Sequence, residues 1–158
     1  MIPDFTDEGL LPPGVHEATL EELREKLGFS RRRRDLIDGL ERALTLMGGC
    51  EVRRVYLDGS FVTDKPRPGD IDECYDVEPG MDLQSMYPIW PLSHLNRARS
   101  KAAFGVEFFP ADTVEAGSGQ PFLQFFQRDR EGSPKGVVAM ELGVRCDDPQ
   151  RTGAPQRR

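Results

Sequence analysis

The chain has 158 residues, of which 37% are hydrophobic and 30% are charged, and its formal net charge at pH 7 is -6. This length is typical of a single domain, the hydrophobic content is too high for a wholly disordered chain, and the negative charge argues against non-specific nucleic-acid binding by the whole surface. No apolar run approaches the roughly 18 residues of a membrane span, and the first residues do not resemble a signal segment, so we expect a cytoplasmic protein without membrane contact.

Residues 1–17 are rich in proline, glycine and acidic side chains, which favours an extended N-terminal arm. A first helix is expected to follow this arm. Thr19 is a suitable N-cap, and Glu22, three residues later, completes a capping box. Gly28 is typical of a residue that ends a helix. The pattern therefore predicts a helix between Thr19 and Gly28.

A second helix is predicted over 31–47, because Ser30 can cap it and apolar residues recur along it at helical spacing. The helix opens with four consecutive arginines, 31–34, although cations at a helix N-terminus oppose the helix dipole. The run either serves a partner or forms a solvated charged face. An RNA acceptor, an acidic protein face and the acidic surface of this protein itself are the possible partners, and the sequence leaves all of these alternatives open.

The rest of the chain alternates short β-like and helix-like segments that are separated by proline-containing or glycine-containing turns. The order helix, strand, strand, helix, strand predicts a single α+β domain over 1–146, with a small mixed or antiparallel sheet and helices packed on one face. A polar, disordered tail is expected over 147–158. The predicted strands span 52–57, 70–77, 105–110 and 136–142, and the further predicted helices span 93–103 and 121–127.

The most informative segment joins a Gly59-Ser60 turn to Asp70 and Asp72 at the start of a predicted strand. Successive side chains of a strand point to opposite faces. Asp70 and Asp72 therefore project to one side, while Ile71 points into a core. Two carboxylates on one face repel each other unless a cation lies between them, and magnesium takes such oxygen ligands and then holds phosphates. The glycine would let backbone N–H groups approach a phosphate closely.

An apolar strand, Gly59-Ser60, a short loop and Asp70-Ile71-Asp72 together resemble the signature of the polymerase-β-type nucleotidyltransferase superfamily, and in particular its minimal nucleotidyltransferases. The resemblance covers residues 36–112. It implies a nucleotidyltransferase-like core in which Gly59 and Ser60 contact the triphosphate of a nucleotide. It also implies that Asp70 and Asp72 bind two metal ions, magnesium or else manganese, and that a later strand supplies a third carboxylate.

Glu107 is the best candidate for the third carboxylate, as a catalytic group and metal ligand, because it lies in the apolar segment 105–110, where an unpaired charge is costly. The alternative is an exposed position on a half-buried strand. Lys65 either contacts the triphosphate or is a solvated loop residue. The chain departs from the family at Phe61, where an arginine is frequent, and at Asp58, where an apolar residue is common. Asp58 would then add to the acidic site.

The resemblance implies a metal-dependent nucleotidyltransferase that moves a nucleoside monophosphate from an NTP, such as ATP, to a hydroxyl of RNA (for example tRNA) or of a protein. It also suggests a place in a toxin–antitoxin or phage-defence system, with a cognate toxin or antitoxin, or a second copy of the chain, as partner. The alternative is a catalytically silent nucleotidyltransferase-like module that acts as an antitoxin or scaffold. A third hypothesis is an RNA-binding protein that uses the arginine run.

Overall fold

A five-stranded mixed sheet forms the centre of the fold. The structure is a computed structural model, and it describes residues 1–81 and 97–143. The strands follow the order β1-β5-β2-β3-β4: β2 is antiparallel to both β5 and β3, whereas β1 with β5 and β3 with β4 form parallel pairs. The strands are β1 (Gly14–Glu17), β2 (Arg54–Asp58), β3 (Ile71–Tyr75), β4 (Val106–Pro110) and β5 (Gly136–Glu141).

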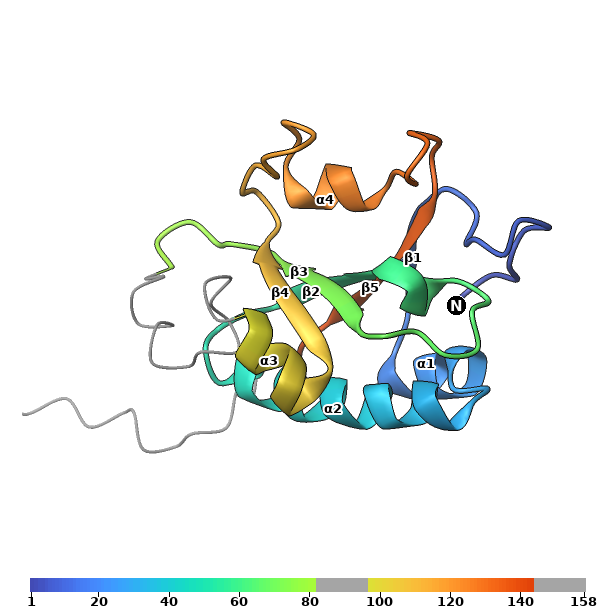
Figure 1. The fold of residues 1–158 in the computed structure, drawn as a ribbon. Helices are drawn as coiled ribbons and strands as arrows, with labels where there is room; N and C mark the ends of the chain where they lie inside the picture. The colour runs from blue at the N-terminus through green and yellow to red at the C-terminus, as the bar shows by residue number, and fades with distance from the viewer. Residues whose placement is uncertain (82–96, 144–158) are drawn as a thin grey trace, which may run out of the picture.

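Helices cover the two faces of the sheet unequally (Figure 1). Three of them lie together on one face, and the short fourth helix lies on the opposite face. The α+β class predicted from the sequence is therefore confirmed, with one short helix added on the second face. Among the described residues, no helix combines the length and the apolar content needed to cross a membrane. The helices are α1 (Leu20–Leu27), α2 (Arg31–Gly48), α3 (Arg97–Phe104) and α4 (Phe122–Phe126).

Side chains that alternate along the strands build two hydrophobic cores. Val55 and Leu57 of β2 join the larger core, which includes the buried faces of α1 and α2. Tyr56 lies between them in sequence but joins the smaller core, with Phe109 and Phe126 of α4. Burying a side chain such as Leu57 stabilises the fold by about 1.5–3 kcal/mol. This burial therefore fixes the register, and even-numbered residues of β2 and β3 face the α4 side of the sheet.

The N-termini of α1 and α2 form as the sequence predicts. Thr19 and Glu22 make a reciprocal capping box, with side chain–backbone hydrogen bonds of 2.9 and 3.1 Å. The Ser30 hydroxyl accepts a hydrogen bond from the backbone N–H of Arg33 at 3.2 Å. Such caps contribute on the order of 1 kcal/mol each. They set the start of α2, and with it the position of Arg33.

The N-terminal arm predicted over 1–17 ends in a strand that the sequence analysis misses. Gly14–Glu17 forms β1 at the edge of the sheet, and it pairs in parallel with residues 136–139 at the start of β5. A pairing between such distant segments leaves no local pattern, so the proline and glycine content dominates the sequence-based expectation. The tail expected over 147–158 and the first part of the helix expected over 93–103 lie outside the described residues.

Candidate functional site

Three carboxylates, from β4, from β3 and from the residue just before β3, meet on the α4 side of the sheet. Asp72 and Glu107 lie opposite each other in the parallel register of the two strands, and Asp70 directly precedes β3. One carboxylate oxygen of each residue lies within 4.8 Å of the others, and all three side chains are partly buried. The structure thus brings together the three residues that the sequence suggests as metal ligands. Their oxygen donors suit a hard divalent cation.

A fourth carboxylate, Asp58, extends this group. Antiparallel pairing of β2 with β3 places Asp58 opposite Asp72, so both side chains point to the same face. Lys135 Nζ lies 2.5 Å from Asp58 Oδ1, and these two side chains are only 11% and 8% exposed. Burial raises the pKa of Asp58, although Lys135 and the backbone N–H of Gly59 act in the opposite direction. The name acidic cluster is used below for Asp58, Asp70, Asp72 and Glu107.

The acidic cluster carries more negative charge than its surroundings neutralise. The pKa of Asp72 is raised to about 7, first by burial and then by repulsion from the other three carboxylates. Lys101 of α3 offers partial compensation, because its Nζ lies 2.7 Å from Asp70 and 3.8 Å from Glu107. The hydrogen bond to Asp70 raises the pKa of Lys101. The remaining excess of negative charge around Asp72 favours the binding of a cation there.

The turn after β2 touches the acidic cluster directly. Gly59 and Ser60 begin the 3-10 turn η1 (Gly59–Val62). Gly59 has a φ of +77°, which lies in the left-handed region that favours glycine. A Cβ at this position would also overlap with Oδ2 of Asp72. The backbone conformation therefore favours glycine, and the close approach of the carboxylate shows that the turn lies against the acidic cluster.

A buried arginine holds the chain that follows this turn. Arg33 of α2 is fully buried, and its guanidinium carbon lies 4.2 Å from the ring centroid of Phe29 and 5.2 Å from that of Phe61. Burial lowers the pKa of Arg33 to about 10, so the side chain remains charged at neutral pH. Charge-assisted hydrogen bonds of this kind are strong, so Arg33 fixes η1 and the loop after it. Its N–H groups donate to the carbonyls of Leu27, Ser60, Phe61, Thr63 and Lys65.

Two further arginines of the run 31–34 also contact the protein itself. Arg32 donates hydrogen bonds to two carbonyls of the loop just before Asp70, and Arg34 donates to the carbonyl of Gly28 at 3.1 Å. Arg31 is exposed at the start of α2. Contacts within the protein therefore account for three of the four arginines. One of them, Arg32, helps to position the entry to β3.

The remaining residues singled out from the sequence have different environments. Lys65 is exposed in the loop between η1 and β3, and its carbonyl accepts a hydrogen bond from Arg33 Nε at 2.9 Å. Phe61 occupies the position at which the nucleotidyltransferases that the sequence resembles often have an arginine, but Phe61 is fully buried. Sequence reasoning misses Lys135 as a site residue, because its pairing with Asp58 depends on the β2–β5 register. The local signal is a lysine directly before an apolar strand.

Comparison with known proteins places the chain in a family whose function is unknown. Residues 3–141 match a family of unknown function, DUF6932. No curated protein and no solved structure matches the chain. The acidic cluster, the Gly59-Ser60 turn and Lys135 all lie within the matched region.

Proposed function

We propose that this chain, which belongs to the DUF6932 family, is a metal-dependent nucleotidyltransferase that moves a nucleoside monophosphate from an NTP to a hydroxyl group. One observation carries the proposal. Three carboxylates with oxygens within 4.8 Å of one another lie beside a turn in which Gly59 closely approaches the Asp72 carboxylate. Nucleotidyl transfer depends on positioning and charge neutralisation more than on covalent chemistry, and such an arrangement can provide both.

Asp70, Asp72 and Glu107 would hold magnesium or manganese ions, and their chemistry fits this role. Hard divalent cations prefer carboxylate oxygens, and the pKa of Asp72 is raised first by burial and then by repulsion from the neighbouring carboxylates. When bound, such ions neutralise phosphate charge during the transfer. Lys101, whose Nζ lies 2.7 Å from Asp70, would then share this carboxylate with an ion.

Residues of the protein would seat the nucleotide and accept the proton. The backbone N–H and the hydroxyl of Ser60 would bind phosphate oxygens, since the neighbouring Gly59 has no side chain to obstruct them. Lys65 would contact the outer phosphates from its loop. The acceptor oxygen forms a bond to the α-phosphorus while the bond to the leaving pyrophosphate breaks. The partly exposed Glu107 would take the proton of the acceptor hydroxyl.

The proposed acceptor is a hydroxyl of RNA, such as a tRNA end, or of a protein side chain. The resemblance to minimal nucleotidyltransferases supports this choice, together with a toxin–antitoxin or phage-defence role in the cytoplasm, where NTPs and magnesium are available. Because the described helices α1, α2 and α3 cover the face opposite the acidic cluster, the acceptor would approach from the α4 side. A cognate partner or a second copy of the chain would complete its recognition.

The test is transfer of label from each α-labelled NTP, in the presence of magnesium and cell lysate. The wild-type protein should label an RNA or protein band. The double variant Asp70→Asn/Asp72→Asn should label none, because it removes two of the proposed ion ligands. Asp112→Asn is a matched control, since this aspartate is exposed just beyond β4 and lies outside the acidic cluster. It should retain full transfer.

The same experiment separates the enzyme from a binding module. Transfer by the wild type and by Asp112→Asn, but not by the double variant, supports catalysis and identifies the acceptor. Absence of transfer, together with nucleotide binding that does not depend on magnesium or on Asp70, would leave a nucleotidyltransferase-like scaffold instead.

A further inference from the structure

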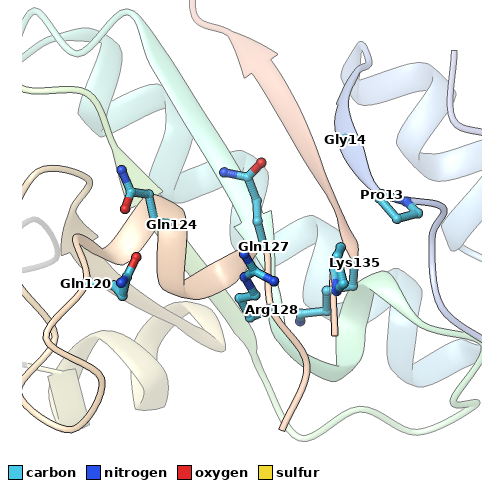
Figure 2. Close-up of a pocket in the computed structure, with 8 residues that line it drawn as sticks. Pro13, Gly14, Gln120, Gln124, Gln127, Arg128 and Lys135 are labelled. Atoms are coloured by element: carbon cyan, nitrogen blue, oxygen red, sulfur yellow. The ribbon is translucent and has the colours of Figure 1, made fainter. Parts of the chain in front are cut away.

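A polar pocket lies on the α4 side of the sheet, where the start of β5 meets the N-terminal segment and the end of α4 (Figure 2). Its volume is about 290 Å³, which suits a small chemical group rather than a whole large ligand. It is called the Lys135 pocket below. Its walls include Pro13 and the polar side chains of Gln120, Gln124, Gln127, Arg128 and Lys135.

The lining of the Lys135 pocket suits an anionic group. Two cationic side chains and three amides line it, and no carboxylate does, although acidic residues outnumber basic ones in the chain by 27 to 21. Gln127 Nε2 and Arg128 Nη1 each donate to a nearby carbonyl, at 2.9 and 3.1 Å. Because a primary amide has two N–H donors and a guanidinium has five, both side chains keep donors for a ligand.

Lys135 belongs to both the pocket and the neighbourhood of the acidic cluster. Its Nζ lies 2.5 Å from Asp58, and the side chain is largely buried, so the ammonium group is held in place rather than free in solvent. An ammonium group has three N–H donors. Lys135 can therefore keep its contact with Asp58 and still donate to a ligand in the pocket.

The N-terminal wall of the pocket is held close to β5. The N–H of Gly136 donates to the carbonyl of Leu11 at 3.0 Å, and a Cβ on Gly136 would overlap with the carbonyl of Pro12. The two segments can approach this closely because residue 136 is glycine. The walls of the Lys135 pocket are thus set by backbone contacts rather than by flexible side chains alone.

We propose that the Lys135 pocket binds a phosphate group of the substrate, and that Lys135 links this subsite to the acidic cluster. The inference rests on the proposed function only for the molecule that carries the phosphate, which is either the NTP or an RNA acceptor. Anion binding itself is inferred from the lining and does not depend on the proposed function. Arg128 provides the planar fork of donors that suits phosphate oxygens.

Calorimetric titration of the full chain with inorganic tripolyphosphate, in metal-free buffer, tests the inference. The wild type should bind, and Arg128→Met should weaken binding by about tenfold, as expected for the loss of charge-assisted hydrogen bonds. The double variant Asp58→Asn/Lys135→Met should weaken it similarly, without leaving a buried charge unpaired. Arg130→Met is the matched control, because this exposed arginine of the same turn does not line the pocket, and it should change affinity by less than about twofold.

These variants also define the results that would contradict phosphate binding in the pocket. Absence of tripolyphosphate binding, or an equal loss in Arg130→Met and Arg128→Met, overturns the inference. Competition distinguishes the two phosphate carriers. Displacement by ATP that depends on Arg128 assigns the phosphate to the nucleotide, and displacement by a short single-stranded RNA alone assigns it to the acceptor. Displacement by neither would also overturn the inference.

The proposed function and the pocket can fail separately. Asp70→Asn/Asp72→Asn should abolish transfer but preserve tripolyphosphate binding in metal-free buffer. Tripolyphosphate binding that depends on Arg128, in a protein without any transfer activity, supports the pocket and overturns the proposed function alone. Transfer that is unaffected by Arg128→Met overturns the role of the pocket alone.

Discussion

Asp72 is surrounded by like charges, so its protonation state should control ion binding. A carboxyl whose pKa is raised to about 7 holds a proton through much of the range below neutrality, and a metal ion must displace that proton. We therefore expect the affinity for manganese to rise by about tenfold between pH 6 and pH 8. Titration followed by electron paramagnetic resonance would measure it. Asp112→Asn should show the same rise, and a flat profile in the wild type would contradict the role given to Asp72.

Glu73 presents a different electrostatic problem, in the larger core. It is fully buried, and neither carboxylate oxygen has a hydrogen-bond partner among the described residues. Burial raises its pKa well above the ordinary value. The pKa of Glu73 is higher in the folded state than in the unfolded state. Below about pH 4.5 Glu73 is neutral in both states and does not lower the unfolding free energy of the protein. The unfolding free energy then falls as the pH rises from about 4.5 toward the pKa of the folded state.

Glu73→Gln should therefore stabilise the protein at high pH. The amide keeps the shape but cannot ionise, so we expect a gain in unfolding free energy at pH 8 and little difference near pH 5. Urea unfolding at the two pH values would measure the gain. Glu78→Gln, at an exposed position after β3, should show no such trend. A pH-independent effect of Glu73→Gln would show that ionisation of Glu73 is not the cause.

Arg33 combines structural and functional importance in one side chain. Arg33→Met would leave several carbonyls of η1 and its loop without their donors. We expect a loss of about 3–5 kcal/mol in unfolding free energy and weaker nucleotide binding, because the Gly59-Ser60 turn loses its support. Arg31→Met, at an exposed position of the same run, should change stability by less than about 0.5 kcal/mol. Equal effects of the two substitutions would contradict the role of Arg33.

At the scale of elements, the contact between α2 and α3 positions one edge of the site. A Cβ on Gly39 of α2 would overlap with the carbonyl oxygen of Phe104, and α3 also carries Lys101, the partner of Asp70. Gly39→Ala should therefore destabilise the protein by about 1–3 kcal/mol, despite the higher helix propensity of alanine. Hydrogen exchange in α3 should increase as well.

Gly48→Ala is the matched control for this prediction. Gly48 ends the same helix, and nothing lies within 4 Å of a Cβ built there. Alanine should therefore be neutral at this position, or stabilising by up to about 1 kcal/mol. A similar loss of stability in both variants would show that the packing against α3 is not responsible.

Local patterns predicted most elements and the placement of Asp70 and Asp72, because alternation along a strand depends only on neighbouring residues. Glu107 required the additional assumption that a later strand supplies a third carboxylate, which the resemblance to nucleotidyltransferases implied. The pairing of Asp58 with Lys135 and the strand β1 depend on the register between distant segments, and no local signal encodes that register. The polar partners of the site residues were therefore the hardest feature to predict from the sequence.

At the scale of the whole molecule, the sheet separates the larger hydrophobic core from the candidate functional site. The larger core and three helices occupy one face, while the acidic cluster and the Lys135 pocket share the other face with the small α4 core. Substitutions on the α4 side can thus alter charge and recognition without disturbing the larger core. This division allows variants of the acidic cluster and of the Lys135 pocket to be folded proteins with changed binding.

The edge strand β1 protects β5 from pairing with another molecule. Residues 136–140 of β5 are all buried, and removal of residues 1–17 would expose the apolar edge that β1 covers, a typical route to association. We expect this truncated chain to form concentration-dependent oligomers, whereas the full chain should not change its mass over the same range. Light scattering after size-exclusion chromatography would measure both. A truncated chain that keeps the mass of the full chain at every concentration would contradict the protective role of β1.

The same strand pair also orders events during synthesis. Gly14 pairs with Gly136, so β1 leaves the ribosome long before its partner exists. At a translation rate of about 5–20 residues per second, β1 waits for several seconds without a neighbour. Lys135, which lines the pocket, directly precedes β5 and is therefore synthesised at the same late stage. The nascent chain can therefore bury α1 and α2 against β2 early, but the phosphate subsite is completed only when the last strand arrives.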